Sequence, residues 1–143
     1  MAYPSFSEVS RSFAPGWFAA VMGSGVLALT TRALAQRWPW LALPAECLHW
    51  FNSALFLLLA LPWLTRWLRF REAALQTMKH PVQANFYPTF SIALLVLAAQ
   101  WQAFTPWVEV ALSLWWLGVI LHFVFSFAVL FFMFSGEHVA VDH

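Results

Sequence analysis

The stretch LWWLGVILHFVFSFAVLFFMF, residues 114–134, decides the fold class of this chain. It contains no Asp, Glu, Lys or Arg, and its apolar side chains would cover every side of a helix. A bilayer core about 30 Å thick needs about 20 such residues at a rise of about 1.5 Å per residue. A transmembrane strand would instead alternate apolar and polar residues over about 10 positions. The stretch therefore predicts a transmembrane helix.

The composition extends this prediction to the whole chain. Of its 143 residues, 62% are hydrophobic and only 9% are charged, whereas soluble domains are about 25% charged. So few charges cannot solvate a protein surface, which excludes a water-soluble enzyme. The formal net charge of +1 offers no basic patch for nucleic acid, and the single cysteine, Cys47, excludes an intrachain disulfide. The partner that the composition predicts is the lipid bilayer.

Other charge-poor runs of similar length predict further spans. The expected membrane helices are residues 15–34, 47–64, 86–104 and 110–134. Residues 1–14 and 135–143 would lie outside the membrane. A cleaved signal sequence in place of the first span is disfavoured, because the remainder is too apolar for a soluble secreted protein. The sequence thus predicts an all-α integral membrane protein with four transmembrane helices.

The distribution of Lys and Arg predicts the orientation. Residues 65–85 carry three arginines and one lysine, whereas residues 105–109 carry no basic side chain. Cytoplasmic loops are enriched in Lys and Arg, so residues 65–85 and both termini are expected on the cytoplasmic side. This orientation places five basic residues inside and two outside. The expected location is a cell membrane, in bacteria the inner membrane.

A short motif occurs twice. Phe13, Pro15 and Trp17 recur as Phe86, Pro88 and Phe90, displaced by 73 positions. Each copy opens a helix that is followed by a returning helix, which predicts two parallel helical hairpins. The alternative is coincidence, because proline at the first turn of a helix is common for local reasons.

The spans differ in side-chain size. The first and third are rich in Gly, Ala, Ser and Thr, whereas the second and fourth are dominated by Leu, Phe and Trp. Small residues suit close helix contacts or a passage, and bulky ones suit lipid. We therefore expect an inner pair formed by the first and third spans and an outer pair formed by the second and fourth. The alternative is that the glycines only allow helices to pack.

The inner pair supplies the candidate site residues. The predicted lining of a passage consists of Gly23, Ser24, Gly25, Phe86, Thr89 and Phe90. Such an uncharged lining holds solutes through hydroxyl groups and helix ends. Pro88 is expected to kink the third span and to expose backbone groups to the passage.

The ionisable residues suggest no catalytic or metal site. A haem site would need both His49 and His122 as axial ligands. Their positions in the spans predict that they differ in depth by about 15 Å, which disfavours such a site. We expect no cofactor, and we expect a hydroxyl or a backbone carbonyl to satisfy His122. The tail residues His138, Asp142 and His143 are typical of a frayed polar end rather than of a metal site.

Two stretches together resemble a known family. FAPGWFAAVMGSGVLAL (residues 13–29) and KHPVQANFYPTFSIALLVLA (residues 79–98) resemble the tellurite-resistance/dicarboxylate transporter family, which is related to slow anion channels. The resemblance implies a ten-helix fold of five hairpins, whose inner helices line a pore gated by a phenylalanine. It also implies trimers that carry small anions such as malate, tellurite or sulfite.

The resemblance covers roughly residues 13–143 and implies the first two of the five hairpins. We therefore expect a fragment of an anion carrier, in which the gating phenylalanine of the family has no counterpart. Two alternatives remain. One is a small four-helix protein that self-assembles or serves as an accessory subunit, and the other is a membrane-bound redox subunit, which the haem geometry disfavours.

Overall fold

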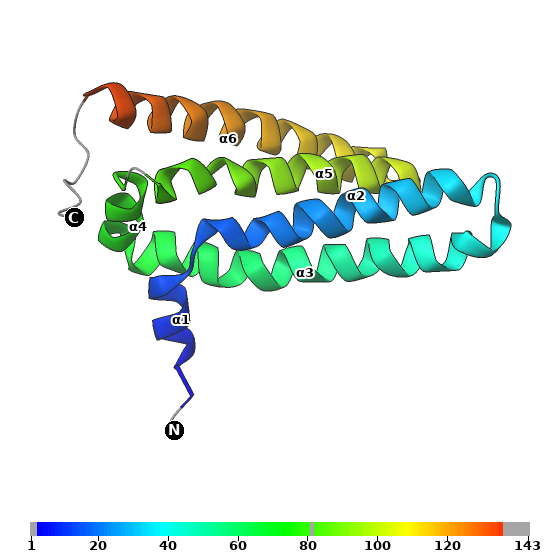
Figure 1. Ribbon diagram of the computed structural model, residues 1–143, viewed down its shortest axis with the longest axis horizontal. Helices are drawn as coiled ribbons and strands as arrows, with labels where there is room; N and C mark the ends of the chain where they lie inside the picture. Colours follow the sequence, from blue (N-terminus) through cyan, green and yellow to red (C-terminus); the bar gives the residue numbers. More distant parts are fainter. Residues whose placement is uncertain (1–2, 81, 136–143) are drawn as a thin grey trace.

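The computed structural model describes residues 3–80 and 82–135, which form helices and connecting turns with no strand among them (Figure 1). The first part of the chain contains α1 (Phe6–Ser12), η1 (Pro15–Trp17), α2 (Phe18–Ala35), η2 (Pro39–Leu41) and α3 (Ala42–Arg69). The second part contains α4 (Arg71–Met78), η3 (Gln83–Phe86), α5 (Pro88–Phe104) and α6 (Val108–Ser135). Here η denotes a short 3-10 helix.

Helix length and composition confirm the predicted fold class. Among the described residues, three segments are long and apolar enough to cross a membrane: Pro15–Ala35, Pro39–Arg69 and Val108–Ser135. A fourth candidate arises if Arg71–Met78 is counted with Gln83–Phe104, from which it is bent by 108°. Helix α3 extends beyond the expected span 47–64 at both ends. Hydropathy marks only the part that crosses the hydrocarbon, whereas helical hydrogen bonding continues into the interface.

Proline begins several of these helices. The first residues of η1, η2 and α5 are Pro15, Pro39 and Pro88, respectively. A proline fits there because the N–H that it lacks would have no helical partner. Pro88 therefore starts α5 instead of kinking the third span, which corrects the kink expected from the sequence.

The helices form two hairpins that lie side by side (Figure 1). Helix α2 packs against α3, and α5 packs against α6. The hairpins meet mainly through α2 and α5, which lie between α3 and α6 in the bundle (Figure 1). Both α2 and α5 start at the end of the bundle that carries α1 and α4. The arrangement is that of two parallel hairpins with an inner and an outer pair of helices.

An aromatic cluster fills the space between α2, α3 and α5. Phe18 is fully buried, and its ring lies 4.9 Å from that of Phe90 and 5.9 Å from that of Phe56, measured between centroids. Trp63 joins them with its ring centroid 5.9 Å from that of Phe90. Tilted and edge-to-face contacts of this kind suit the charge distribution of aromatic rings. The cluster holds the two hairpins together near the start of both inner helices.

Candidate functional site

Helix α2 has one packed face and one open face. The packed face consists of Phe18, Val21, Gly25 and Ala28, all buried. The open face consists of Ala20, Gly23, Leu27 and Thr30, all exposed. Within each set the residues follow one another at intervals of three or four, which places them on one side of a helix. An inner helix thus leaves a stripe of mostly small residues uncovered by the described part of the chain.

The glycines at 23 and 25 lie on opposite faces. A Cβ atom added to Gly23 would meet nothing within 4 Å. A Cβ atom added to Gly25 would clash with Cγ1 of Val96 on α5 and would lie 2.9 Å from Nδ2 of Asn52 on α3. Gly25 therefore serves close packing of three helices, whereas Gly23 borders open space. Of these two candidate residues, only Gly23 is on the open face.

Ser24 belongs to a polar network that joins three helices. Its hydroxyl lies 2.7 Å from the carbonyl oxygen of Ala20 and 2.6 Å from Oδ1 of Asn52, and it can donate to either. Nδ2 of Asn52 donates to Oε1 of Gln100 at 2.7 Å. Asn52 and Gln100 are fully buried. The half-buried Ser24 hydroxyl is therefore held at the border of the open face by a buried pair of amides.

The sequence interpretation missed Asn52 and Gln100. It considered ionisable groups within the spans and passed over uncharged amides. Polar side chains such as Asn and Gln in transmembrane helices form hydrogen bonds between helices. Their presence in otherwise apolar runs was the signal that could have identified them, although it would not have revealed that they pair with each other.

Two candidate residues flank the start of α5: Phe86 is the last residue of η3, and Thr89 is in α5. The Phe86 side chain is 47% exposed. The hydroxyl of Thr89 lies 2.8 Å from the carbonyl oxygen of Pro15, which ties the start of α5 to η1. It also lies near the carbonyl oxygen of Phe86 in its own turn. The donor of Thr89 is thus engaged with backbone groups.

Phe90 is 7% exposed and belongs to the aromatic cluster. Its ring stacks on that of Phe56 at a centroid distance of 5.8 Å and an interplanar angle of 23°. Among the candidate residues, the structure brings Gly23 and Ser24 to the open side of α2 and leaves Phe86 exposed at the start of α5. It places Gly25 and Phe90 in the packing behind that side.

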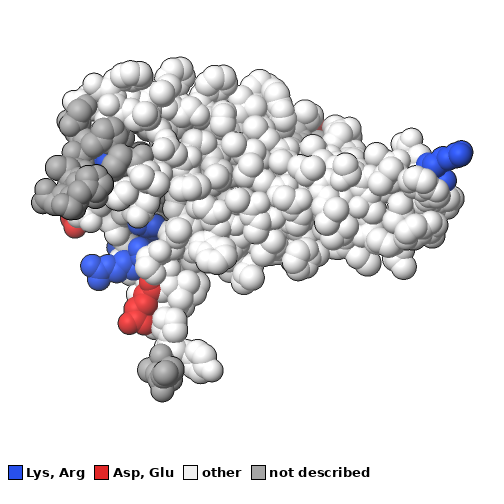
Figure 2. Space-filling view, viewed as in Figure 1, with Lys and Arg blue, Asp and Glu red and all other residues white. Residues whose placement is uncertain are grey.

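Charged residues gather at the two ends of the bundle, separated by an uncharged surface (Figure 2). One end carries the basic residues of α1, α3 and α4 and the residue that follows α4: Arg11, Arg66, Arg69, Arg71 and Lys79. Arg66 differs from its neighbours because it is only 4% exposed. Its guanidinium donates to the carbonyl oxygens of Phe13 and Ala73 and to the hydroxyl of Thr77. Arg66 therefore joins α3, α4 and the segment that leads into η1.

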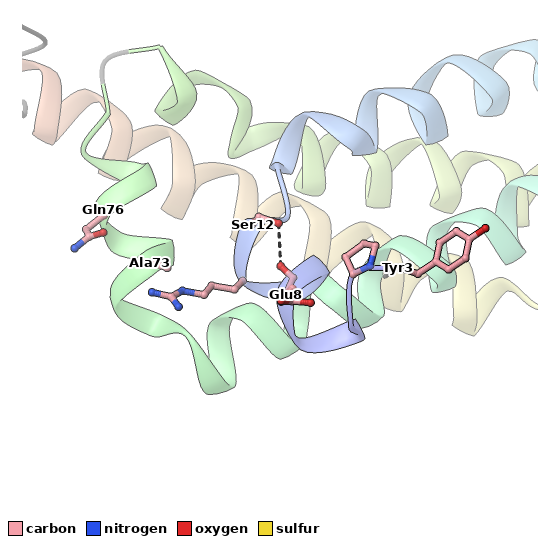
Figure 3. Close-up of a pocket in the computed structure, with 7 residues that line it drawn as sticks. Tyr3, Glu8, Ser12, Ala73 and Gln76 are labelled. Carbon is pink, nitrogen blue, oxygen red and sulfur yellow. Dashed lines mark hydrogen bonds between the residues drawn. The ribbon is translucent and has the colours of Figure 1, made fainter. Parts of the chain in front are cut away.

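Several cavities open at this end, among them two that border α1 or η1. One, of about 470 Å³, lies where η1 approaches η3. Its lining consists of Ser12, Ala14, Pro15, Gly16, Arg66, Gln83 and Phe86. The other, of about 740 Å³, lies between α1 and α4 and includes Tyr3, Glu8 and Gln76 (Figure 3). The N–H and hydroxyl of Ser5 donate to the carboxylate of Glu8 and lower its pKa. The described lining of the α1–α4 cavity thus holds one carboxylate, Glu8, and one guanidinium, Arg11.

The two candidate haem ligands are far apart. His49 is fully buried, and its ring stacks on Phe104 at a centroid distance of 4.8 Å. Nδ1 of His122 lies 3.1 Å from Oγ of Ser91, which confirms that a hydroxyl satisfies this histidine. Ser91 and Phe104 are separated by about 20 Å along α5, at about 1.5 Å per residue. The two imidazoles therefore cannot bridge one haem.

No group of three or more His, Cys, Asp or Glu in residues 3–80 and 82–135 is placed to hold a metal ion. The tail residues His138, Asp142 and His143 lie outside the described residues.

Comparison with known proteins identifies relatives over nearly the whole chain. The family model of the voltage-dependent anion channels matches residues 12–143. The uncharacterized transporter MJ0576 of Methanocaldococcus jannaschii is 39% identical over 142 residues, which cover 95% of this chain and 39% of the relative. The uncharacterized transporter MJ0762 of the same organism is 35% identical over 133 residues, which cover 93% of this chain and 39% of the relative. No solved structure matches the chain.

The chain therefore spans about two fifths of the length of these relatives, at 39% of each. The family match confirms the resemblance that the two quoted stretches indicated.

Proposed function

Because the chain belongs to the voltage-dependent anion channel family, we propose that it contributes the inner helices α2 and α5 to a pathway for small anions across a membrane. The relatives named as transporters support transport as the general activity. The uncovered stripe of α2 supports its place beside the pathway.

The observation that carries this proposal is the contrast between the exposed sides of inner and outer helices. The outer helices α3 and α6 expose bulky side chains such as Leu57, Leu61 and Phe127, as expected for contact with lipid. The open face of α2 exposes the small residues Ala20, Gly23 and Thr30, with Leu27 as its one bulky member. The surface around Gly23 leaves room for a solute, because a Cβ atom added there would meet nothing within 4 Å.

The charge distribution also suits anions. The open face of α2 carries no charged side chain, so an anion would meet hydroxyl and backbone groups there. Among the described residues, five basic side chains surround the end of the bundle where both inner helices start, against the two carboxylates of Glu8 and Glu72. Clustered positive charge raises the local concentration of anions and speeds their entry.

The family resemblance suggests the substrate class. We infer that the pathway carries C4-dicarboxylates such as malate or small oxyanions of the tellurite and sulfite type. The same resemblance suggests a homotrimer as the assembly.

The orientation is part of the proposal. Both termini and residues 65–85 are placed in the cytoplasm, and the membrane is the cell membrane. The test uses a Gln76→Cys variant in which the exposed Cys47 is first replaced by Ser. An impermeant thiol reagent added to intact cells should fail to label this cysteine and should label it after the cells are opened. Ready labelling in intact cells would overturn the orientation.

The pathway itself is tested in a chimera in which this chain replaces the matching 39% of the MJ0576 relative. A Gly23→Leu variant should fold normally and lose most anion flux into liposomes, because the added side chain would enter open space. The matched control is Ala54→Leu at an exposed position of the outer helix α3, which should leave the flux unchanged. A normally folded Gly23→Leu chimera with unchanged flux would remove α2 from the pathway wall.

A second experiment separates transport from an accessory role. The 143-residue chain, reconstituted alone, should insert into liposomes without saturable flux of malate or sulfite, because the open face of α2 would lack neighbours. Saturable flux by the chain alone would instead favour the self-assembly of several copies into a complete pathway.

A further inference from the structure

The buried guanidinium of Arg66 has donors to spare. Arginine has five N–H donors, and the structure gives Arg66 three hydrogen bonds, to Phe13, Ala73 and Thr77. Its Nε is buried and has no partner among the described residues. All three acceptors are neutral oxygens. Hydrogen bonding in the structure therefore leaves at least one donor of a buried cation unused.

The positive charge of Arg66 is also uncompensated. Across residues 3–80 and 82–135, no carboxylate forms an ion pair with this guanidinium. A buried charge is costly unless it is paired with an opposite charge and hydrogen-bonded. A cation that is 4% exposed and lacks a carboxylate partner is therefore best stabilised by an anion that comes from solution.

The neighbouring cavity has room for such an anion. Arg66 lines the 470 Å³ cavity between η1 and η3, and among the described lining residues it alone is charged. Ser12 and Gln83 add uncharged polar side chains. The volume lies within the range of about 300 to 1,000 Å³ that is usual for small-molecule sites. Among the described residues, the cavity therefore combines an accessible volume with a hydrogen-bonded guanidinium that has no carboxylate partner and no carboxylate in the lining.

We infer that this cavity is an anion-binding site in which Arg66 is the charged ligand, and that it takes a small carboxylate or oxyanion from solution. The planar guanidinium suits both groups because its N–H donors match the two oxygens of a carboxylate. The role of the bound anion rests on the proposed function. Because the site lies where both inner helices start, it would be the first site at which a transported anion binds. The phosphate of a lipid headgroup has the same chemistry, and the choice of lipid in the experiment distinguishes it from a soluble anion.

The test is a titration of malate or sulfate into the purified chain in phosphatidylcholine nanodiscs at constant ionic strength. The thermal unfolding midpoint, followed by tryptophan fluorescence, should rise saturably with anion concentration. Arg66→Gln should weaken the apparent affinity by about tenfold or more, as expected for the loss of a charge-assisted hydrogen bond. Arg69→Gln removes the same charge from an exposed neighbour outside the cavity and should leave the affinity unchanged.

A second variant guards against misfolding, because Arg66 also joins three segments of the chain. Ala14 lines the cavity with an exposed side chain and forms no bond to Arg66. Ala14→Phe should keep the unfolding midpoint measured without anion and abolish the rise with malate or sulfate. An unchanged saturable rise in Ala14→Phe, or no saturable rise in the wild-type chain, would overturn the inference.

Nanodiscs that contain phosphatidylglycerol distinguish the source of the anion. If anionic lipid stabilises the chain while malate and sulfate do not, the soluble-anion site is refuted. The binding and flux measurements fail independently. Saturable anion binding without flux in the chimera would contradict the proposed function and leave the binding site intact. Full flux in a chimera that no longer binds anions at Arg66 would contradict the role of this site in the pathway.

Discussion

Glycine has a different role on each of the two faces of α2. On the packed face, Gly25 lets α5 and the amide of Asn52 approach the backbone, and any side chain there would collide with Val96. On the open face, a Cβ atom added to Gly23 would meet nothing within 4 Å. The glycines are two positions apart, which turns them to different sides of the helix. A small residue in a membrane helix therefore indicates either contact or space, and the neighbouring helices decide which.

The largest expected effect tests the aromatic packing behind α2. Phe90→Ala should destabilise the fold by about 3 to 5 kcal/mol, because it leaves a cavity among buried rings. It should not raise anion flux in the chimera, as it would if Phe90 narrowed the pathway. Phe86→Ala is the matched control because Phe86 is 47% exposed. The measurement is the unfolding midpoint in detergent together with flux, and a stable Phe90→Ala protein with raised flux would contradict the assignment of Phe90 to the core.

The next effect compares the glycines directly. Gly25→Leu should cost about 1 to 3 kcal/mol or more by overpacking the contact with α5 and α3. Gly23→Leu should leave folding unchanged, since its side chain enters open space. Size-exclusion chromatography and thermal unfolding of both variants provide the measurement. Equal loss of folded protein would show that both faces are packed.

A smaller effect concerns the amides behind Ser24. Asn52→Leu and Gln100→Leu should each destabilise the chain, and the double variant should lose less than the sum of the two. The expected coupling is about 0.6 kcal/mol, the average for hydrogen bonds between helices in one membrane protein. A double-mutant cycle by unfolding in mixed micelles measures it. Strict additivity would show that the 2.7 Å contact between Asn52 and Gln100 contributes nothing.

The smallest effect is expected from Ser24→Ala. The half-buried hydroxyl lies at the border of the two faces, with oxygen partners at 2.6 and 2.7 Å. Its removal should lower the free energy of unfolding by about 1 kcal/mol or less. It should alter the ratio of malate flux to sulfite flux in the chimera more than it alters the total flux. Unchanged flux ratios would place Ser24 wholly on the packed face.

Much of the fold could be predicted from the sequence because long apolar runs have few alternatives. The run at residues 114–134 is apolar on all sides and therefore specifies a membrane helix. The same uniformity hides which side of a helix turns inward. Phe86 and Phe90 share a stripe at helical spacing, yet Phe86 lies in η3 and is exposed while Phe90 is buried against Phe18. Periodicity alone could not separate them.

The candidate site was predicted less completely than the fold. The cluster of small and hydroxyl residues in the first span predicts Gly23 and Ser24 as lining residues, and their role in a passage stays a prediction. Arg66 was counted only as a positive charge for orientation, since a sequence does not reveal that a basic residue at the end of a span is 4% exposed. Burial of that kind depends on α1 and α4 folding back over the end of α3, and such long-range packing leaves no local pattern.

The Asn52–Gln100 hydrogen bond has a consequence for biogenesis. Its partners are 48 residues apart in sequence and belong to different hairpins. At a synthesis rate of about 5 to 20 residues per second, Gln100 follows Asn52 out of the ribosome after roughly 2 to 10 seconds. During that interval the first hairpin enters the membrane while Nδ2 of Asn52 lacks the acceptor that Gln100 later provides. Asn52 lacks this hydrogen bond until the second hairpin is made. We therefore expect the insertion machinery to retain the first hairpin until the second one arrives.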